Sequence, residues 1–299
     1  MRYFIAVAEE GSFSSAAERR LHTAQPSLSR QIRDLELELG VKLLERKARG
    51  VALTTAGRVF LDHARLALLQ IEAAGEAARR VDRPEKPGFV VGFLAGQEVV
   101  WLAETLRILR EESPNVEITF TSKSSPELAQ ALMQGKVDVA LLRHETQTAG
   151  LTYKFLFKEP LVAVLPRSHR LAARKTVRPQ DLARETFISP AQLAPVLKSV
   201  IDDYVAKVGI TWKQKYDAET ISGGMSLVAS TGGVTLLPLY VKNIMIPSVV
   251  ARPLQGEPPT INLMMGYSKS NTSPLLMQFL ARADELVSRV SQKQGPDSR

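Results

Sequence analysis

Residues 4–64 read FIAVAEEGSFSSAAERRLHTAQPSLSRQIRDLELELGVKLLERKARGVALTTAGRVFLDHA, and this stretch decides the fold. It opens on an apolar stripe that predicts a helix, and Gly11 predicts where that helix ends. Ser12 or Ser14 is suited to cap a second, short helix that runs to about Leu21. The chain therefore begins with two short helices separated by a tight turn.

A third helix is predicted after a polar turn. Thr23 is a suitable N-cap, and Pro26 falls in the first turn, where a missing backbone N–H costs little. One face of this helix is apolar and ends at Gly40: Leu28, Ile32, Leu35 and Leu39. The opposite face is polar: Gln25, Ser27, Ser29, Arg30, Arg33 and Asp34.

Two short helices, a turn and a helix with a polar, arginine-bearing first half are typical of a helix-turn-helix, whose second helix enters the DNA major groove. Residues 41–46 and 51–54 then predict two short strands joined by a loop at 47–50, which together form a wing. Basic residues near the wing tip can reach phosphates or the minor groove: Arg46, Lys47 and Arg49. An ordinary helical subdomain with a basic hairpin is the alternative.

Part of the chain's positive charge lies in this same region. The 299 residues include 39 Lys and Arg against 31 Asp and Glu, a formal net charge of +8. Residues 42–58 alone carry +4, because five basic residues there face a single acidic one. A second basic run at 167–178 is interpreted as a solvated face. The concentration at 42–58 favours an anionic partner such as DNA.

The composition excludes several classes of site. The chain has no cysteine, which rules out disulfides, zinc ribbons, iron–sulfur clusters and thiol catalysis. Its four histidines show no metal-ligand spacing, and it has neither a glycine-rich phosphate loop nor a G-x-S-x-G motif. We therefore expect no metal, no cofactor and no enzyme. No apolar run approaches the roughly 20 residues of a membrane span, and no signal peptide is evident, so a soluble cytoplasmic protein without membrane contact is expected.

Residues 55–83 contain no proline and predict one long helix. An apolar seam recurs along it at alternating spacings of four and three residues, which is a heptad pattern: Phe60, Ala64, Ala67, Ile71, Ala74, Ala78 and Val81. Such a helix is too long for one small neighbour to bury, so the seam predicts pairing with a second copy of the chain. Packing on the chain's own domains is the alternative.

Residues 83–88 (RPEKPG) predict a linker, because two prolines, a glycine and charges leave nothing to pack. Beyond it, strands and helices alternate as β-α-β-α-β up to residue 142, which implies a parallel sheet with right-handed crossovers. A strand at 161–165 and a long final helix over 274–290 are also predicted. This pattern suits two small α/β lobes that bind a ligand at the carboxyl ends of their strands.

The segment quoted above resembles the DNA-binding end of a LysR-type transcriptional regulator. Weaker similarity continues through GKVDVALLR, EPLVAVLPRSHRLA and VASTGGVTLLP, so the resemblance covers essentially the whole chain. The family usually has a few residues before this point, whereas Met1 here directly precedes Arg2-Tyr3-Phe4, which is typical of a truncated or misassigned start.

The resemblance implies an α/β protein with a winged helix-turn-helix, a long linker helix and a two-lobed effector domain like that of periplasmic binding proteins. The implied domains are 1–58 for DNA binding, 59–87 for the dimerisation helix and hinge, and 88–299 for the effector, with lobe I at about 88–160 and 264–299 and lobe II at about 161–263. Such a regulator binds a double-stranded DNA operator, pairs its long helices antiparallel in a dimer or tetramer, and contacts RNA polymerase if it activates.

Site residues are carried over one position at a time. The residues implied to contact DNA are Thr23, Gln25, Pro26, Ser27, Ser29, Arg30, Arg33, Arg46 and Arg49. Those implied to contact the effector are Gly96, Gln97, Ser124, Ser125, Arg143, Ser189, Pro195, Val196 and Gly223. The aromatic-degradation branch of the family often has serine where Gly96 stands, and Gly223 leaves room for a bulkier group. We therefore hypothesise an aromatic or extended carboxylate of hydroxycinnamate or benzoate type.

Each assignment has a plainer alternative. Gln25, Ser27 and Ser125 could serve only as helix caps, Arg143 could be a structural ion-pair partner, and Gly223 a loop glycine. For the whole chain, the alternatives are a small-acid-binding protein or an enzyme-like sensor with an attached DNA-binding domain. A periplasmic solute-binding protein would share the two lobes but not the first 58 residues.

Overall fold

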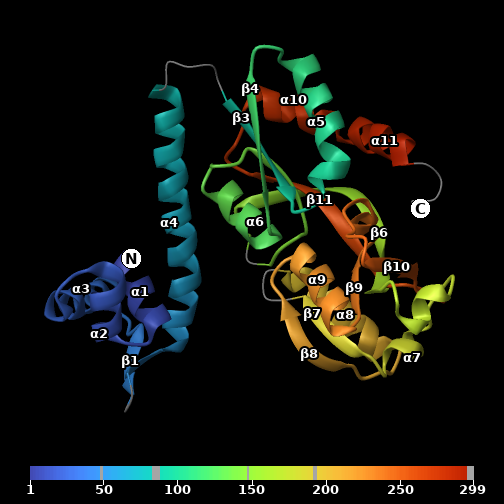
Figure 1. The fold of residues 1–299 in the computed structure, drawn as a ribbon. Coiled ribbons are helices and arrows are strands. Elements are labelled where there is room, and N and C mark those ends of the chain that lie inside the picture. The colour runs from blue at the N-terminus through green and yellow to red at the C-terminus, as the bar shows by residue number, and fades with distance from the viewer. Residues whose placement is uncertain (48–49, 83–87, 147, 191–193, 295–299) are drawn as a thin grey trace. The chain divides into compact units, whose positions relative to one another are not determined.

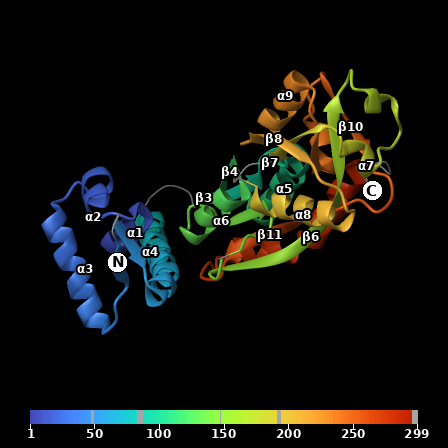
Figure 2. The ribbon, with the colours of Figure 1, turned by 90° about the horizontal axis from the view of Figure 1, so that it is seen from below.

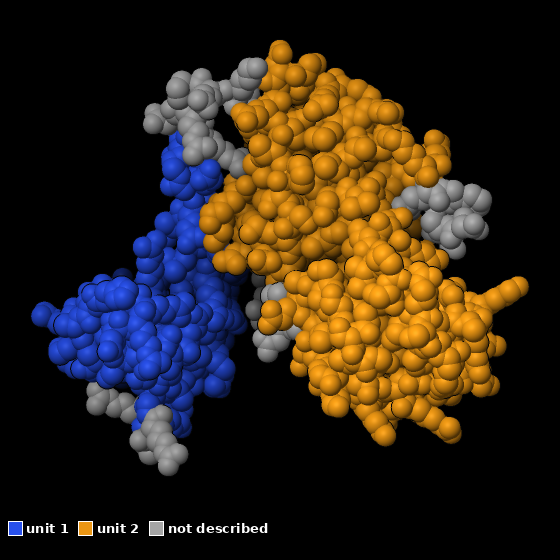
Figure 3. Space-filling view, in the orientation of Figure 1, with its two compact units in different colours: residues 1–79 blue, residues 80–299 orange. Residues whose placement is uncertain are grey.

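The structure is a computed structural model that describes residues 1–47, 50–82, 88–146, 148–190 and 194–294 (Figure 1). The chain divides into two units, residues 1–79 and residues 80–299, which Figure 3 shows in different colours. The first unit has one hydrophobic core, and the second has two.

The first unit begins with helix α1 (Arg2–Glu10), which ends where expected because Gly11 adopts the left-handed conformation at φ 61°. The Ser12 hydroxyl caps the short helix α2 (Phe13–Ser15). This helix continues as a wider helical turn, η1 (Ala16–Leu21). The two short helices expected from the sequence are therefore present.

Helix α3 (Gln25–Leu39) is the third helix, and it ends at Gly40 as predicted. The prediction that Thr23 caps it is wrong. Ala24 occupies the N-cap position, and no side chain there accepts a hydrogen bond from the first turn. Pro26 lies in that first turn, where its missing N–H leaves one donor fewer to satisfy at a helix start without a side-chain cap.

The wing consists of strands β1 (Leu44–Lys47) and β2 (Gly50–Leu53), which pair antiparallel. A buried carboxylate, Glu36 of α3, attaches the wing to the helices. It accepts hydrogen bonds from the Lys42 ammonium group and from two backbone amides at the start of the wing, at 2.7–3.0 Å. Burial disfavours the charged form of Glu36, but these hydrogen bonds outweigh it and hold its pKa below the usual value.

Helix α4 (Thr55–Asp82) has the length predicted. The start of the heptad seam belongs to the first unit's own core, because Phe60 and Ala64 pack there against α1 and α3 residues. Farther along, Ile71 is 54% exposed although it is apolar. The side chain of Val81 lies outside the described residues. The seam is thus occupied by the chain itself at its start and open from about Ile71 onward.

The second unit begins with the parallel sheet predicted from the sequence. Strand β3 lies between β4 and β5 and pairs parallel with both. The elements in chain order are β3 (Gly88–Leu94), α5 (Glu98–Glu112), β4 (Glu117–Lys123), α6 (Ser125–Met133) and β5 (Val139–Leu142). The carboxyl ends of the parallel strands are followed by the starts of α5 and α6, where ligands bind in such folds.

Strand β6 (Leu151–Pro166) connects the two lobes. Its first part pairs antiparallel with β11 (Thr260–Ser268), beside which it runs in Figure 2. Beyond Pro160 it pairs instead with β9 (Thr235–Pro238) and β10 (Val249–Pro253). The sequence predicted only residues 161–165 of this strand. Strand β11 begins at Thr260, and its next residue, Ile261, still packs in the core of lobe II.

Lobe II packs helices around a short parallel pair of strands, β7 (Thr186–Pro190) and β8 (Lys213–Ala218). The helical elements are η2 (Arg170–Ala173), α7 (Pro179–Leu182), α8 (Pro195–Lys207), α9 (Ile221–Thr231) and η3 (Leu239–Asn243). Both α8 and α9 contact β7, and α9 also contacts β8.

The prediction of one long final helix is wrong. The chain instead forms α10 (Pro274–Ala281) and α11 (Ala283–Gln294), both of which pack on α5. The break at Arg282 places its guanidinium group within hydrogen-bond distance of Glu285 and of Glu112 on α5. None of the helices in the described part of the chain is long and apolar enough to cross a membrane.

Gly57 provides a test of how tightly α4 packs on the wing. A Cβ at Gly57 would lie 2.0 Å from the backbone oxygen of Leu43, so Gly57→Ala forces the backbone apart. We expect a loss of about 1–3 kcal/mol in the free energy of unfolding of the first unit. The control is Gly75→Ala on the same helix, where the nearest atom, at 3.4 Å, belongs to a flexible arginine. That change should stabilise by about 0.5–1 kcal/mol. Thermal unfolding and hydrogen exchange of the full chain measure both, and equal midpoints would contradict the packing.

Candidate functional site

The face of α3 opposite the core presents polar groups to solvent. Pro26, Arg30 and Arg33 lie on one side of the helix and are exposed, as are Gln25 and Ser27. Ser29 and Thr23 are half-buried. On the other side, Leu28 and Ile32 are buried and hold the helix onto its domain.

The two arginines of this face are free to reach an outside partner. The Arg30 side chain is 83% exposed, and its Nε lies 3.9 Å from the Asp34 carboxylate, too far for a hydrogen bond. In the wing, Lys47 is exposed and pairs with Glu45 at 3.0 Å. Arg49 and the side chain of Arg46 lie outside the described residues.

A cavity of about 300 Å³, here called the interlobe cavity, lies between the two lobes of the second unit. Lobe I contributes the ends of β3 and β5 and the start of α6, and lobe II contributes the starts of α8 and α9. Much of the lining is apolar: Leu94, Val196, Leu197, Ile221, Leu237 and Ile261. The cavity thus has the apolar walls and few polar groups typical of small-molecule sites.

The polar groups of this cavity suit an anion. Arg143 is 4% exposed, and its Nη2 bonds to Glu159 at 2.8 Å. Its Nη1 has no hydrogen-bond partner among the described residues. The buried Ser125 hydroxyl accepts the Arg143 amide at 2.9 Å and keeps its own hydrogen for another acceptor. The starts of α6 and α9 add the positive ends of two helix dipoles.

Four of the nine effector residues expected from the sequence line this cavity: Ser124, Ser125, Arg143 and Val196. Five do not line it: Gly96, Gln97, Ser189, Pro195 and Gly223. Ser189 is buried and donates to the carbonyl oxygen of Pro190. Pro195 occupies the first turn of α8, next to the lining residue Val196.

The two glycines expected at the effector site, Gly96 and Gly223, lie outside the lining of the interlobe cavity. At Gly96 the space a side chain would take is filled, because a Cβ there would lie 2.7 Å from Ile244 and 3.0 Å from Tyr240. Gly223 does not line the cavity, and its amide donates to Thr220, which caps α9. The glycine that lines the cavity is its neighbour, Gly224.

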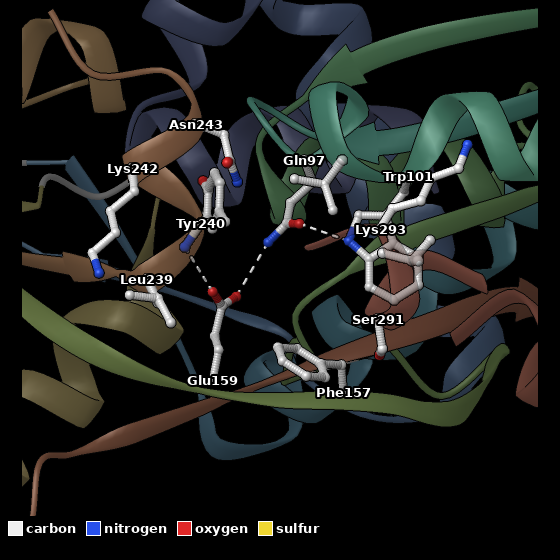
Figure 4. A pocket seen from close by; sticks show the side chains of 12 residues that line it. Gln97, Trp101, Phe157, Glu159, Leu239, Tyr240, Lys242, Asn243, Ser291 and Lys293 are labelled. Atoms are coloured by element: carbon white, nitrogen blue, oxygen red, sulfur yellow. Dashed lines mark hydrogen bonds between the residues drawn. The ribbon is translucent and has the colours of Figure 1, made fainter. Parts of the chain in front are cut away.

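Gln97 faces a second cavity of about 260 Å³, here called the flanking cavity (Figure 4). Its amide donates to Glu159 at 3.2 Å and accepts from the Trp101 indole at 2.9 Å. Glu159 also accepts the backbone N–H of Tyr240 at 3.1 Å. Tyr240 lines both cavities, so this buried network forms part of the wall between them.

Glu145 is a lining residue of the interlobe cavity that sequence reasoning missed. It is 7% exposed, and its Oε1 has no hydrogen-bond partner among the described residues. Burial raises its pKa to about 7. The available signal was its place two residues beyond Arg143, after a buried strand, but nothing in the sequence shows that the carboxylate is enclosed.

Two family models match the chain. Residues 1–58 match the model described as bacterial regulatory helix-turn-helix protein, lysR family. Residues 84–287 match the LysR substrate binding domain.

Relatives match over nearly the full length. The chain is 38% identical over 296 residues to the Hca operon transcriptional activator HcaR of Escherichia coli (strain K12), covering 97% of this chain and 98% of HcaR. It is 34% identical over 281 residues to the transcriptional regulator AlsR of Bacillus subtilis (strain 168), covering 94% of this chain and 93% of AlsR. The solved structure of full-length CbnR complexed with its target DNA is 27% identical, with a TM-score of 0.56 and 97% of each chain covered.

These findings confirm the expected fold, a winged helix-turn-helix followed by a two-lobed α/β domain. The relatives are named as transcriptional regulators, which confirms the expectation of a regulator rather than an enzyme. The chain therefore belongs to the LysR family of bacterial DNA-binding transcriptional regulators.

Proposed function

We propose that this regulator binds a small organic acid, an aromatic carboxylate, in the interlobe cavity, and that the bound acid switches operator binding or activation. The observation that carries the proposal is the Nη1 of Arg143, a buried cationic group without a partner among the described residues, at a cavity whose walls are otherwise largely apolar. A carboxylate would satisfy that group, and a ring would fill the apolar part.

The size of the cavity supports a small ligand. Its volume of about 300 Å³ is at the lower end of the range of about 300–1,000 Å³ found for ligand sites. An acid with a single ring, of benzoate or hydroxycinnamate type, suits this space. Ser125 and the starts of α6 and α9 would share the carboxylate with Arg143, because free N–H and O–H groups at helix starts favour anions.

The DNA-binding role is assigned to the exposed face of α3 and to the wing. In this proposal Gln25, Ser27 and Ser29 read base edges or position the helix, while Arg30 and Arg33 contact phosphates or guanines. Thr23 and Pro26 lie at the helix start, and Arg46 and Arg49 reach the flanking backbone. The CbnR structure, which holds a target DNA, supports this reading.

Assembly and activation complete the proposal. The open part of the heptad seam on α4 supports pairing with a second copy, as a dimer or as a tetramer made of two dimers. The name of HcaR as an activator supports activation through contact with RNA polymerase at some promoters. The effector would then act on the geometry of the assembled regulator rather than on a chemical reaction.

Acid binding is tested with Arg143→Lys. The lysine keeps a positive charge beside Glu159 but loses the second N–H group that faces the ligand. We expect affinity for aromatic acids to fall by roughly tenfold to a hundredfold, since a hydrogen bond to a charged group contributes about 1.5–3 kcal/mol. Arg252→Lys is the matched control, because Arg252 binds the carbonyl of Ala172 in lobe II. Calorimetry on the full chain measures both, and a panel of aromatic acids that never binds would reject this ligand class.

DNA binding is tested with Arg30→Ala and Arg33→Ala. Each should weaken binding to the DNA upstream of the protein's own gene, located by footprinting, while acid binding survives. Arg107→Ala on α5, a mostly exposed arginine in the second unit, is the control. For the wing, Arg46→Ala and Arg49→Ala should each reduce the slope of log affinity against log salt by about 0.9 per phosphate contact. A slope that neither wing variant changes would remove the wing from the interface.

Pairing through α4 is tested with Ala67→Glu and Ala74→Glu. Ala67 is half-buried and Ala74 exposed on the seam, and a charge there would face its counterpart in the paired helix. Sedimentation should show a smaller species than the parent protein. The control is Gln70→Glu, an exposed position off the seam. Seam variants with the parent's mass would show that the heptad pattern does not mediate assembly.

A further inference from the structure

Glu145 is an acidic group built into a cavity that otherwise suits an acid. Its side chain lines the interlobe cavity and is 7% exposed. Its Oε1 has no hydrogen-bond partner among the described residues, and none of their ion pairs includes its carboxylate. A buried carboxylate oxygen without a partner is costly, so an occupant of the cavity that satisfies it gains that energy on binding.

The backbone holds Glu145 in place. The Thr148 hydroxyl donates to the Glu145 carbonyl oxygen at 2.9 Å, and the Tyr153 hydroxyl donates to Thr148 at 3.1 Å. The next residue back, His144, packs its ring against Tyr153 with centroids 4.5 Å apart. These contacts fasten the loop after β5, and they hold Glu145 in the wall of the interlobe cavity.

Four other charged residues line the interlobe cavity, and two of them form hydrogen bonds within the protein. Arg143 pairs with Glu159, and Glu127 accepts from the Ser124 amide and hydroxyl in a capping box. Lys123 and Glu219 also line the cavity, from β4 and from the turn before α9. Burial, with no charge partner, raises the pKa of Glu145 to about 7.

We propose that Glu145 is a specificity-determining residue that accepts a hydrogen bond from a hydroxyl or amino group of the effector. Resting on the acid-binding function proposed above, this assigns the carboxylate of the ligand to Arg143 and the start of α6, and a donor group of the same ligand to Glu145. The cavity then selects a hydroxy- or amino-substituted acid over the unsubstituted acid. The reason is that the plain acid would leave the buried carboxylate of Glu145 unsatisfied.

A hydrogen bond from the ligand to Glu145 couples ligand binding to the protonation of that carboxylate. A donor on the ligand stabilises the ionised carboxylate, so its pKa falls in the complex and binding releases a proton. Below the free pKa of about 7, the ligand must displace that proton. Affinity for the hydroxylated acid therefore rises with pH through about 7 and levels off above it. A ligand that placed a second carboxylate at Glu145 would behave in the opposite way and take up a proton.

Calorimetry with the full chain tests this with matched probes: benzoate against the monohydroxybenzoates, and cinnamate against the hydroxycinnamates. In the parent protein, at least one hydroxylated acid should bind about tenfold or more tightly than its parent acid. In Glu145→Met, which removes the acceptor and keeps the bulk, that preference should vanish while the plain acid still binds. The retained binding of the plain acid shows that the variant is folded.

The pH readout uses Glu145→Gln, which keeps the shape but cannot titrate. Repeating the titration in two buffers of different ionisation enthalpy should show proton release for the parent protein and none attributable to residue 145 in the variant. Equal affinity for plain and hydroxylated acids, a preference that survives Glu145→Met, or proton uptake would each overturn the role of Glu145 and leave acid binding intact. If no acid of the panel binds the parent protein, the proposed aromatic ligand class fails along with it.

Discussion

The buried carboxylate of Glu159 links the two lobes of the second unit. It is 2% exposed and lies on β6 next to Pro160, where the strand passes from lobe I to lobe II. It accepts hydrogen bonds from Arg143 at the end of β5, from Gln97 at the start of α5, and from the amide of Tyr240 in lobe II. A charge buried this deeply is tolerated only with such partners, so it fixes three elements of both lobes around one point.

The chemistry of the interlobe cavity depends on this buried carboxylate. Because Glu159 binds only Nη2 of the Arg143 guanidinium group, Nη1 has no hydrogen-bond partner among the described residues. The same network separates the flanking cavity from the interlobe cavity. Gln97 and Trp101 are hydrogen-bonded to each other and line the flanking cavity. The two roles that the sequence left open for Arg143, ion-pair partner and ligand contact, are therefore compatible. Nη2 of the guanidinium group forms the ion pair with Glu159, and Nη1 is the nitrogen that the proposed ligand would contact.

Local patterns were sufficient for the parts of the fold that depend on neighbours in sequence. The heptad spacing predicted α4, and alternation of apolar runs predicted the β3-to-β5 parallel sheet. Features set by distant residues were missed: the break at Arg282 depends on α5, and the first ten residues of β6 are held by β11. The candidate site divides in the same way. Ser125 and Arg143 followed from strand ends and helix starts. Gly96 does not line the interlobe cavity, and Tyr240 and Ile244 fill its side-chain space, while Glu145 was not predicted because only the fold encloses it.

In the first unit, the apolar seam of α4 contributes both to the domain core and to an exposed face. Phe60 and Ala64 belong to the core of the winged domain, and Arg65 forms an ion pair with Glu9 of α1, so the start of the helix is fixed to the domain that bears α3. The same apolar seam then continues past Ile71 to an open face. If a second copy pairs there, the crossing of the two long helices sets the spacing between the two recognition helices, because the seam up to Arg79 and the winged domain belong to one compact unit. An effector bound to the second unit would then alter operator contact by shifting residues 1–79 as one body or by changing how the copies assemble.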